Sequence, residues 1–223
     1  METRKIVHEK MPEQTEVYFF NNAGPENTAK VIRTIRRRIR LGDISKILVA
    51  SESGRLALEL RRVFRRPVIV CVTYNEKTRR NHHKPALMKN ELRKQGIIVV
   101  DTIPEPLGRE LTFRNWWEKE TVHLPGASAD LFWMTLICVG GHGLRTAVEI
   151  VFMSVESGVV KVGEKVLSMA GTGYGADSAI VMKASRFSDA VGENPGRRMK
   201  IEGILAMPKR TVWRGYETNS VAP

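Results

Sequence analysis

Two apolar runs without polar alternation constrain the fold of this chain more than any other feature. Apart from Lys46, Pro67 and Thr73 at their ends, residues 46–50 and 67–73 contain only Ile, Leu, Val, Ala and Cys. Strands of a parallel sheet have this composition because both faces of the sheet are covered. A predicted helix over residues 56–64 joins the two runs, so the segment forms a β-α-β unit with a right-handed crossover.

Strand and helix signals continue to alternate on both sides of this unit. The further predicted strands cover residues 17–20, 97–100, 165–170, 178–183 and 201–206. One further predicted helix begins at Asn27 or Thr28. Three others cover residues 86–94, 128–139 and 144–157. Residues 103–126 are irregular and are expected to cross over the sheet. The sequence therefore predicts an α/β fold, a doubly wound, mostly parallel sheet with helices on both faces.

This fold is expected to form one domain over residues 16–210. Residues 1–15 are predicted to be a flexible N-terminal tail, and residues 211–223 a C-terminal tail. The start of the chain lacks the apolar core of a signal peptide, and no apolar run reaches the roughly 18 residues of a membrane span. Cys71 and Cys138 lie in apolar runs, as buried thiols do, and have no metal-ligand spacing. We therefore expect a cytoplasmic protein with no membrane partner and no metal site.

The formal net charge of +12 at pH 7 raises the question of a nucleic-acid partner. The arginines of residues 33–40 are explained by the outer face of an amphipathic helix, and there is no aromatic–basic ladder or zinc-finger spacing. A solvated, ion-paired surface of the kind found in thermophilic proteins accounts for the charge. We therefore disfavour nucleic acid as a partner.

The best-marked candidate site is the loop Ser51-Glu52-Ser53-Gly54-Arg55, between a buried strand and a helix. Such a junction gathers unpaired backbone N–H groups and the positive end of the helix dipole. Gly54 allows close approach of a ligand, the two serines add hydroxyl donors, and Arg55 adds a forked cation suited to phosphate oxygens. On these residues alone, a serine cap beside an exposed arginine is an equal alternative.

The stretch Ile47–Ala57, followed by Arg65–Thr73, resembles the C-terminal α/β domain of pyruvate kinase. In that family the corresponding loop holds a phosphate of a sugar-bisphosphate effector, and Ser51, Ser53, Gly54 and Arg55 match it. Leu56 stands where the family usually places a third hydroxyl. The chain also resembles, nearly end to end, the stand-alone pyruvate kinase α/β-domain proteins of archaea and bacteria. The matching motifs are Asn21–Thr28, Gly141–Leu144, Val148–Ile150, Ser157-Gly158 and Gly173–Ala179.

The resemblance implies a phosphate-ligand fold without pyruvate kinase activity, because only the regulatory domain is matched. Ligands of doubly wound sheets bind outside the carboxyl ends of the strands. Besides the loop, those ends supply Asn21, Asn22, Thr73 and Tyr74 as candidate contacts. We expect a binding module for flavin mononucleotide or a sugar phosphate. Tyr74 and an apolar wall from Leu56 favour the flavin. An enzyme using the same pocket and a nucleic-acid-associated protein are the alternatives.

Three other features have a structural explanation as well as a functional one. Residues 171–177 are rich in glycine but lack the Lys-Ser/Thr of a P-loop, so they form either a loop beside the pocket or a tight turn. Arg145 and Glu149 have the spacing of an ion pair on one helix face. His142 could enter a pocket or cap a helix.

The helix over residues 131–139 is apolar all round, which predicts a homo-oligomer, most simply a symmetric dimer.

Overall fold

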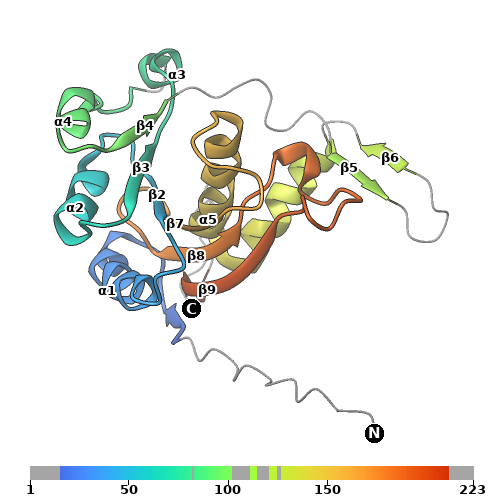
Figure 1. Ribbon diagram of the computed structural model, residues 1–223, viewed down its shortest axis with the longest axis horizontal. Helices are drawn as coiled ribbons and strands as arrows, with labels where there is room; N and C mark the ends of the chain where they lie inside the picture. The colour runs from blue at the N-terminus through green and yellow to red at the C-terminus, as the bar shows by residue number, and fades with distance from the viewer. Residues whose placement is uncertain (1–15, 82, 102–110, 115–120, 125–126, 211–223) are drawn as a thin grey trace, which may run out of the picture.

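A seven-stranded sheet with the order β1-β9-β8-β7-β2-β3-β4 forms the centre of the computed structural model (Figure 1). The structure describes residues 16–81, 83–101, 111–114, 121–124 and 127–210, so the predicted tails lie outside the described residues. The strands are β1 (Tyr18–Phe20), β2 (Lys46–Ala50), β3 (Val68–Val72), β4 (Ile98–Val100), β7 (Lys165–Ala170), β8 (Ser178–Lys183) and β9 (Lys200–Pro208). Only β8 runs antiparallel to its neighbours. The predicted α/β class and mostly parallel sheet are confirmed.

Helices cover both faces of this sheet (Figure 1). On one face lie α1 (Thr28–Ile39), α2 (Arg55–Val63) and α4 (Lys89–Lys94), and on the other lies α5 (Ala127–Glu156). Within β2, Leu48 faces the α5 side, whereas Ile47 and Val49 face α1 and α2. All three are fully buried, which explains why the strand lacks polar alternation.

The long helix α5 combines the two helices predicted over residues 128–139 and 144–157. Gly140 and Gly141 have non-helical backbone angles, and they kink the helix between its two halves. By length and composition, residues Leu131–Glu156 could cross a membrane, contrary to the expectation that no segment would do so. Most of this segment is buried against the sheet, as in the core helix of a globular domain.

The sequence missed several short elements. Helix α3 (Glu76–Asn81) has no apolar stripe to announce it, and α4 begins three residues later than predicted. Within residues 103–126, where no regular structure was expected, β5 (Leu111–Arg114) and β6 (Thr121–Leu124) form an antiparallel pair. Two short 3-10 turns, η1 (Pro25–Asn27) and η2 (Phe187–Asp189), complete the described elements.

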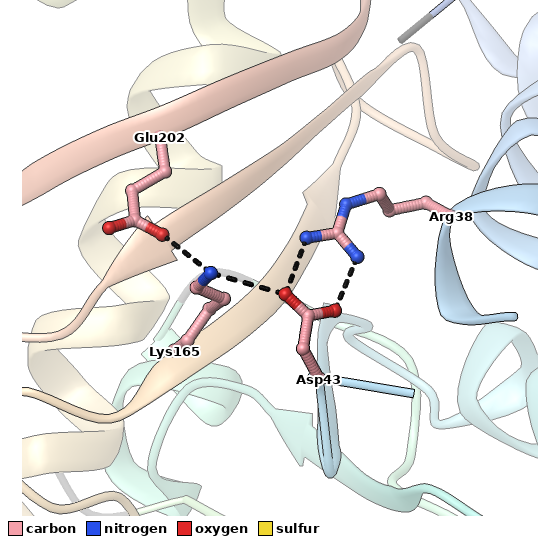
Figure 2. A network of polar contacts seen from close by, with 4 residues as sticks. All are labelled: Arg38, Asp43, Lys165 and Glu202. Carbon is pink, nitrogen blue, oxygen red and sulfur yellow. Dashed lines mark hydrogen bonds and ion pairs between the residues drawn. The ribbon is translucent and has the colours of Figure 1, made fainter. Parts of the chain in front are cut away.

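A four-residue polar network ties α1 to the edge of the sheet at which β7 and β9 begin (Figure 2). Arg38, at the end of α1, is 7% exposed and binds both carboxylate oxygens of Asp43, at 2.5 and 2.9 Å. Lys165 of β7 lies 3.1 Å from Asp43 and 3.1 Å from Glu202 of β9. Arg38 is therefore the exception in an arginine run that was expected to be solvated, while Arg36 and Arg37 are exposed.

Candidate functional site

The loops after β2 and β7 leave the sheet side by side. The two strands are parallel neighbours, and Val49 of β2 pairs with Met169 of β7. The helices connected to these two strands lie on opposite faces of the sheet. Helix α2 follows β2 and lies on one face, whereas α5 precedes β7 and lies on the other. Such a reversal is the usual place for a ligand in an open α/β sheet.

The loop after β2 has the compact geometry that the sequence suggested. Gly54 adopts a left-handed backbone, with φ of 87°, and immediately precedes α2. The N–H of Gly54 donates to Ser51 Oγ at 3.1 Å, and the N–H of Arg55 donates weakly to Ser53 Oγ at 3.4 Å. The serines thus stabilise the turn as acceptors, and their own O–H groups donate to no acceptor within the part of the chain that the structure describes.

Arg55 is the exposed cation of this loop. Its guanidinium forms no ion pair with any residue that the structure describes. The N–H groups of Glu52 and Ser53 likewise donate to no acceptor within the described part of the chain. Leu56, expected to form an apolar wall of the site, is instead buried in the core between α1, α2 and α4. That expectation was wrong, because the first turn of α2 directs Leu56 toward the sheet.

Thr73 lies beneath the loop. Its side chain is buried, its hydroxyl donates to the carbonyl of Glu52 at 3.3 Å, and it accepts a hydrogen bond from Arg79 at 3.1 Å. Arg79 of α3 is itself 8% exposed and also donates to the carbonyls of Glu52 and Pro85. The hydroxyl proton of Thr73 is therefore already used within the protein. Arg79 was missed from the sequence, where its polar surroundings indicated a solvated side chain.

A second cluster surrounds Lys84, which follows α3. Lys84 Nζ lies 2.7 Å from a carboxylate oxygen of Glu52 and 5.6 Å from the centre of the Tyr74 ring. The hydrogen bond to Glu52 raises the pKa of Lys84, and the phenols of Tyr74 and Tyr174 act in the same direction. Tyr174 belongs to the loop after β7 and is 74% exposed. Two exposed tyrosines from different loops therefore lie near one lysine at this edge.

Asn21 and Asn22 do not join this group. They follow β1, which is separated from β2 by β9, β8 and β7. At about 4.8 Å per strand, that separation is roughly 19 Å. Both asparagines are exposed, and the carbonyl of Asn22 accepts a hydrogen bond from the Asn27 side chain at 2.9 Å.

The loop of residues 171–177 connects the two regions. The buried carboxylate of Asp177 accepts hydrogen bonds from Gly24 N–H at 3.2 Å, Thr172 N–H at 2.9 Å and the Ser178 hydroxyl at 2.8 Å. The N–H of Ala176 donates to Thr28 Oγ1 at 2.9 Å. The loop is therefore fastened to the β1–α1 turn, while its Tyr174 side chain is exposed.

The other residues considered for a chemical role lie within helix α5 and strand β3. Arg145 and Glu149 form the expected ion pair, with a nearest distance of 2.9 Å. His142 is half-buried at the kink of α5, next to Gly143, which lies against Asp177 and Ser178. Burial raises the pKa of Cys71 to about 12, so this thiol is not a nucleophile at neutral pH. Among the described residues, no group of three His, Cys, Asp or Glu side chains could hold a metal ion.

The chain matches no model of a known protein family. This edge of the sheet thus combines a loop that turns at Gly54, the exposed guanidinium of Arg55 and the exposed phenols of Tyr74 and Tyr174.

Proposed function

We propose that the chain is a binding module for a phosphorylated small molecule of the flavin mononucleotide type. The ligand lies where β2 and β7 end. Its phosphate contacts the loop of residues 51–55, and its ring lies between that loop and the loop of residues 171–177. We also propose that the chain has the fold of the pyruvate kinase C-terminal domain and that it lacks pyruvate kinase activity.

The single observation that carries the proposal is the unpaired donor set at the start of α2. The N–H groups of Glu52 and Ser53, the serine hydroxyls and the Arg55 guanidinium have no competing acceptor among the described residues. Each charge-assisted hydrogen bond to phosphate contributes on the order of 1.5–3 kcal/mol. Lys84 neutralises Glu52, the one carboxylate in the loop, which would otherwise repel the phosphate.

A planar ring is supported by Tyr74 and Tyr174. Both rings are exposed although neighbouring residues of the same loops are buried, including Thr73 and Ala176. Exposed aromatic side chains from two loops at this edge suit stacking against an aromatic ring. A sugar bisphosphate offers no aromatic face, so this arrangement favours the flavin.

Titration of the purified protein with two ligands tests the proposal. Flavin mononucleotide is followed by quenching of its fluorescence, and fructose bisphosphate by calorimetry. We expect flavin mononucleotide to bind the native protein and to bind Arg55→Ala at least tenfold more weakly. Arg62→Ala is the matched control, because Arg62 is also an exposed arginine of the same helix, two turns away from the loop.

The outcomes separate the parts of the proposal. If neither ligand binds the native protein, or if Arg55→Ala and Arg62→Ala have the same effect, the site assignment is wrong. If only fructose bisphosphate binds, and Arg55→Ala weakens it, the phosphate site stands and the flavin does not. Loss of flavin affinity in Tyr174→Phe would contradict stacking, because phenylalanine keeps the aromatic face.

A further inference from the structure

A groove lies at the edge of the sheet opposite the proposed ligand site. It has a volume of about 730 Å³ and lies between the ends of α1 and α2, beside the segments that lead into β2 and β3. Its apolar lining comes from Ile39, Ile44, Val63, Phe64, Pro67 and Val68. Val63 remains 39% exposed, so the floor presents apolar surface to solvent.

Four arginines line the same groove. Arg36 and Arg40 come from the last turns of α1, and Arg65 and Arg66 follow α2. All four are exposed, and none forms an ion pair with a residue that the structure describes. Unpaired arginines on two separate elements around one hollow form a concentrated positive field.

Helix termination does not account for these side chains. Arg61 donates to the carbonyls of Phe64 and Pro67 and so serves the end of α2. At the end of α1, the backbone N–H groups of Arg40, Leu41 and Gly42 donate to the last helical carbonyls. The guanidinium groups of the four groove arginines make none of these contacts, and they donate to no acceptor among the described residues.

We infer that this groove binds an acidic segment of a partner protein that carries apolar side chains between its carboxylates. Arginine pairs with carboxylate through two parallel hydrogen bonds, and the apolar floor provides burial for the intervening side chains. A nucleic-acid backbone would use the arginines but leave the floor uncovered. The groove also offers no surface on which a base could stack, because Phe64 is the one aromatic residue of the lining and is only 5% exposed.

Fluorescence anisotropy with two labelled probes tests this inference. One probe is a twelve-residue peptide of alternating glutamate and leucine, and the other is a twelve-nucleotide oligothymidylate. We expect the peptide to bind native protein more tightly than the oligonucleotide. Two variants, Arg65→Glu with Arg66→Glu and Arg36→Glu with Arg40→Glu, are each expected to weaken peptide binding at least tenfold.

The matched control is Lys161→Glu with Lys200→Glu. It makes the same change in net charge at two exposed lysines, of which Lys161 precedes β7 and Lys200 is the first residue of β9. Equal weakening in the control would show a general charge effect and overturn the inference, as would absence of peptide binding to native protein. Tighter binding of the oligonucleotide would overturn it in favour of nucleic acid. A tenfold loss confined to the groove variants supports it, independently of flavin or phosphate binding at the other edge.

Discussion

Arg79 donates a hydrogen bond to the Thr73 hydroxyl across 3.1 Å, and the Thr73 hydroxyl donates a hydrogen bond to the carbonyl of Glu52 at 3.3 Å. The same guanidinium reaches the carbonyls of Glu52 and Pro85. One buried cation thus joins the end of β3, the loop after β2 and the segment before α4. The candidate phosphate loop is held from beneath by side chains that do not face the ligand.

We expect Arg79→Ala to lower the free energy of unfolding by about 2–4 kcal/mol, because it leaves buried carbonyl groups without a donor. Arg80→Ala is the control. Its side chain is 77% exposed and pairs with Glu76 on the same helix, and such a pair contributes less than about 1 kcal/mol. Urea unfolding of both variants measures the difference. Equal losses would mean that the Arg79 contacts do not support the loop.

Much of the sheet was predictable because its strands are buried on both faces. The β2, β7 and β8 segments were predicted with the bounds that the structure has, since each consists mostly of apolar residues. Helix α3 was missed because its six residues are polar, and only contacts distant in sequence stabilise it. The order of the strands could not be predicted either, because no local signal states which strands are neighbours.

The same limits apply to the candidate site. Residues 51–55 are contiguous, so one local pattern of serine, glycine and arginine indicated them together. Asn21 and Asn22 were grouped with them because they also follow a strand, but the observed strand order places them roughly 19 Å away. Lys84 and Tyr174 reach the site from other segments, and nothing in their own surroundings in the sequence marks them.

The Arg38–Asp43 pair predicts a loss of stability in acid. The hydrogen bonds from Arg38, and after them that from Lys165, hold the pKa of Asp43 well below its usual range. A carboxyl with a depressed pKa in the folded state stabilises the fold above its unfolded pKa of about 4, and this contribution is lost as the pH falls toward the folded pKa. Asp43→Asn should lower the free energy of unfolding by about 1 kcal/mol at pH 7, a value kept small because the Asp43 side chain is 38% exposed.

Urea unfolding of native protein and Asp43→Asn from pH 7 to pH 2 checks this prediction. The difference between the two proteins should be constant down to about pH 5 and should shrink below pH 4. A difference that grows in acid would have the wrong sign for a depressed pKa and would contradict the assignment.

Asp177 fastens the loop after β7, and its replacement should be costly. Asp177→Ala removes three acceptor contacts at a fully buried position, which should lower the free energy of unfolding by about 3 kcal/mol.

Gly143→Ala should also destabilise the protein, because a Cβ there would lie 2.1 Å from Asp177 Oδ1. Gly96→Ala is the contrasting variant. Gly96 has a left-handed backbone, with φ of 66°, which a side chain would strain, but its Cβ would meet nothing within 4 Å. A smaller loss in Gly143→Ala than in Gly96→Ala would show that the space beside Asp177 accommodates a side chain.

The first half of α5 carries the prediction of a homodimer. Leu131, Met134, Cys138 and Val139 are exposed along one face of the helix, and Leu131 is 69% exposed. Cys138 was expected to be buried, and that expectation was wrong, because α5 turns this face away from the sheet. Although the exposed Thr135 interrupts it, an apolar stripe of this kind is stabilised by pairing with the same stripe of a second copy.

Light scattering of the native protein should therefore give a dimer of the 25.2 kDa chain at micromolar concentration. Met134→Glu should weaken the dimer by about a hundredfold, because pairing would bury an unpaired carboxylate. Val191→Glu is matched to it in exposure, at 39% against 40% for Met134, and lies outside α5, so it should leave the dimer intact. A native monomer, or equal dissociation of both variants, would assign the exposed stripe to something other than self-association. Dissociation of Met134→Glu alone would place the dimer interface at the first half of α5, on the sheet face opposite α1 and α2.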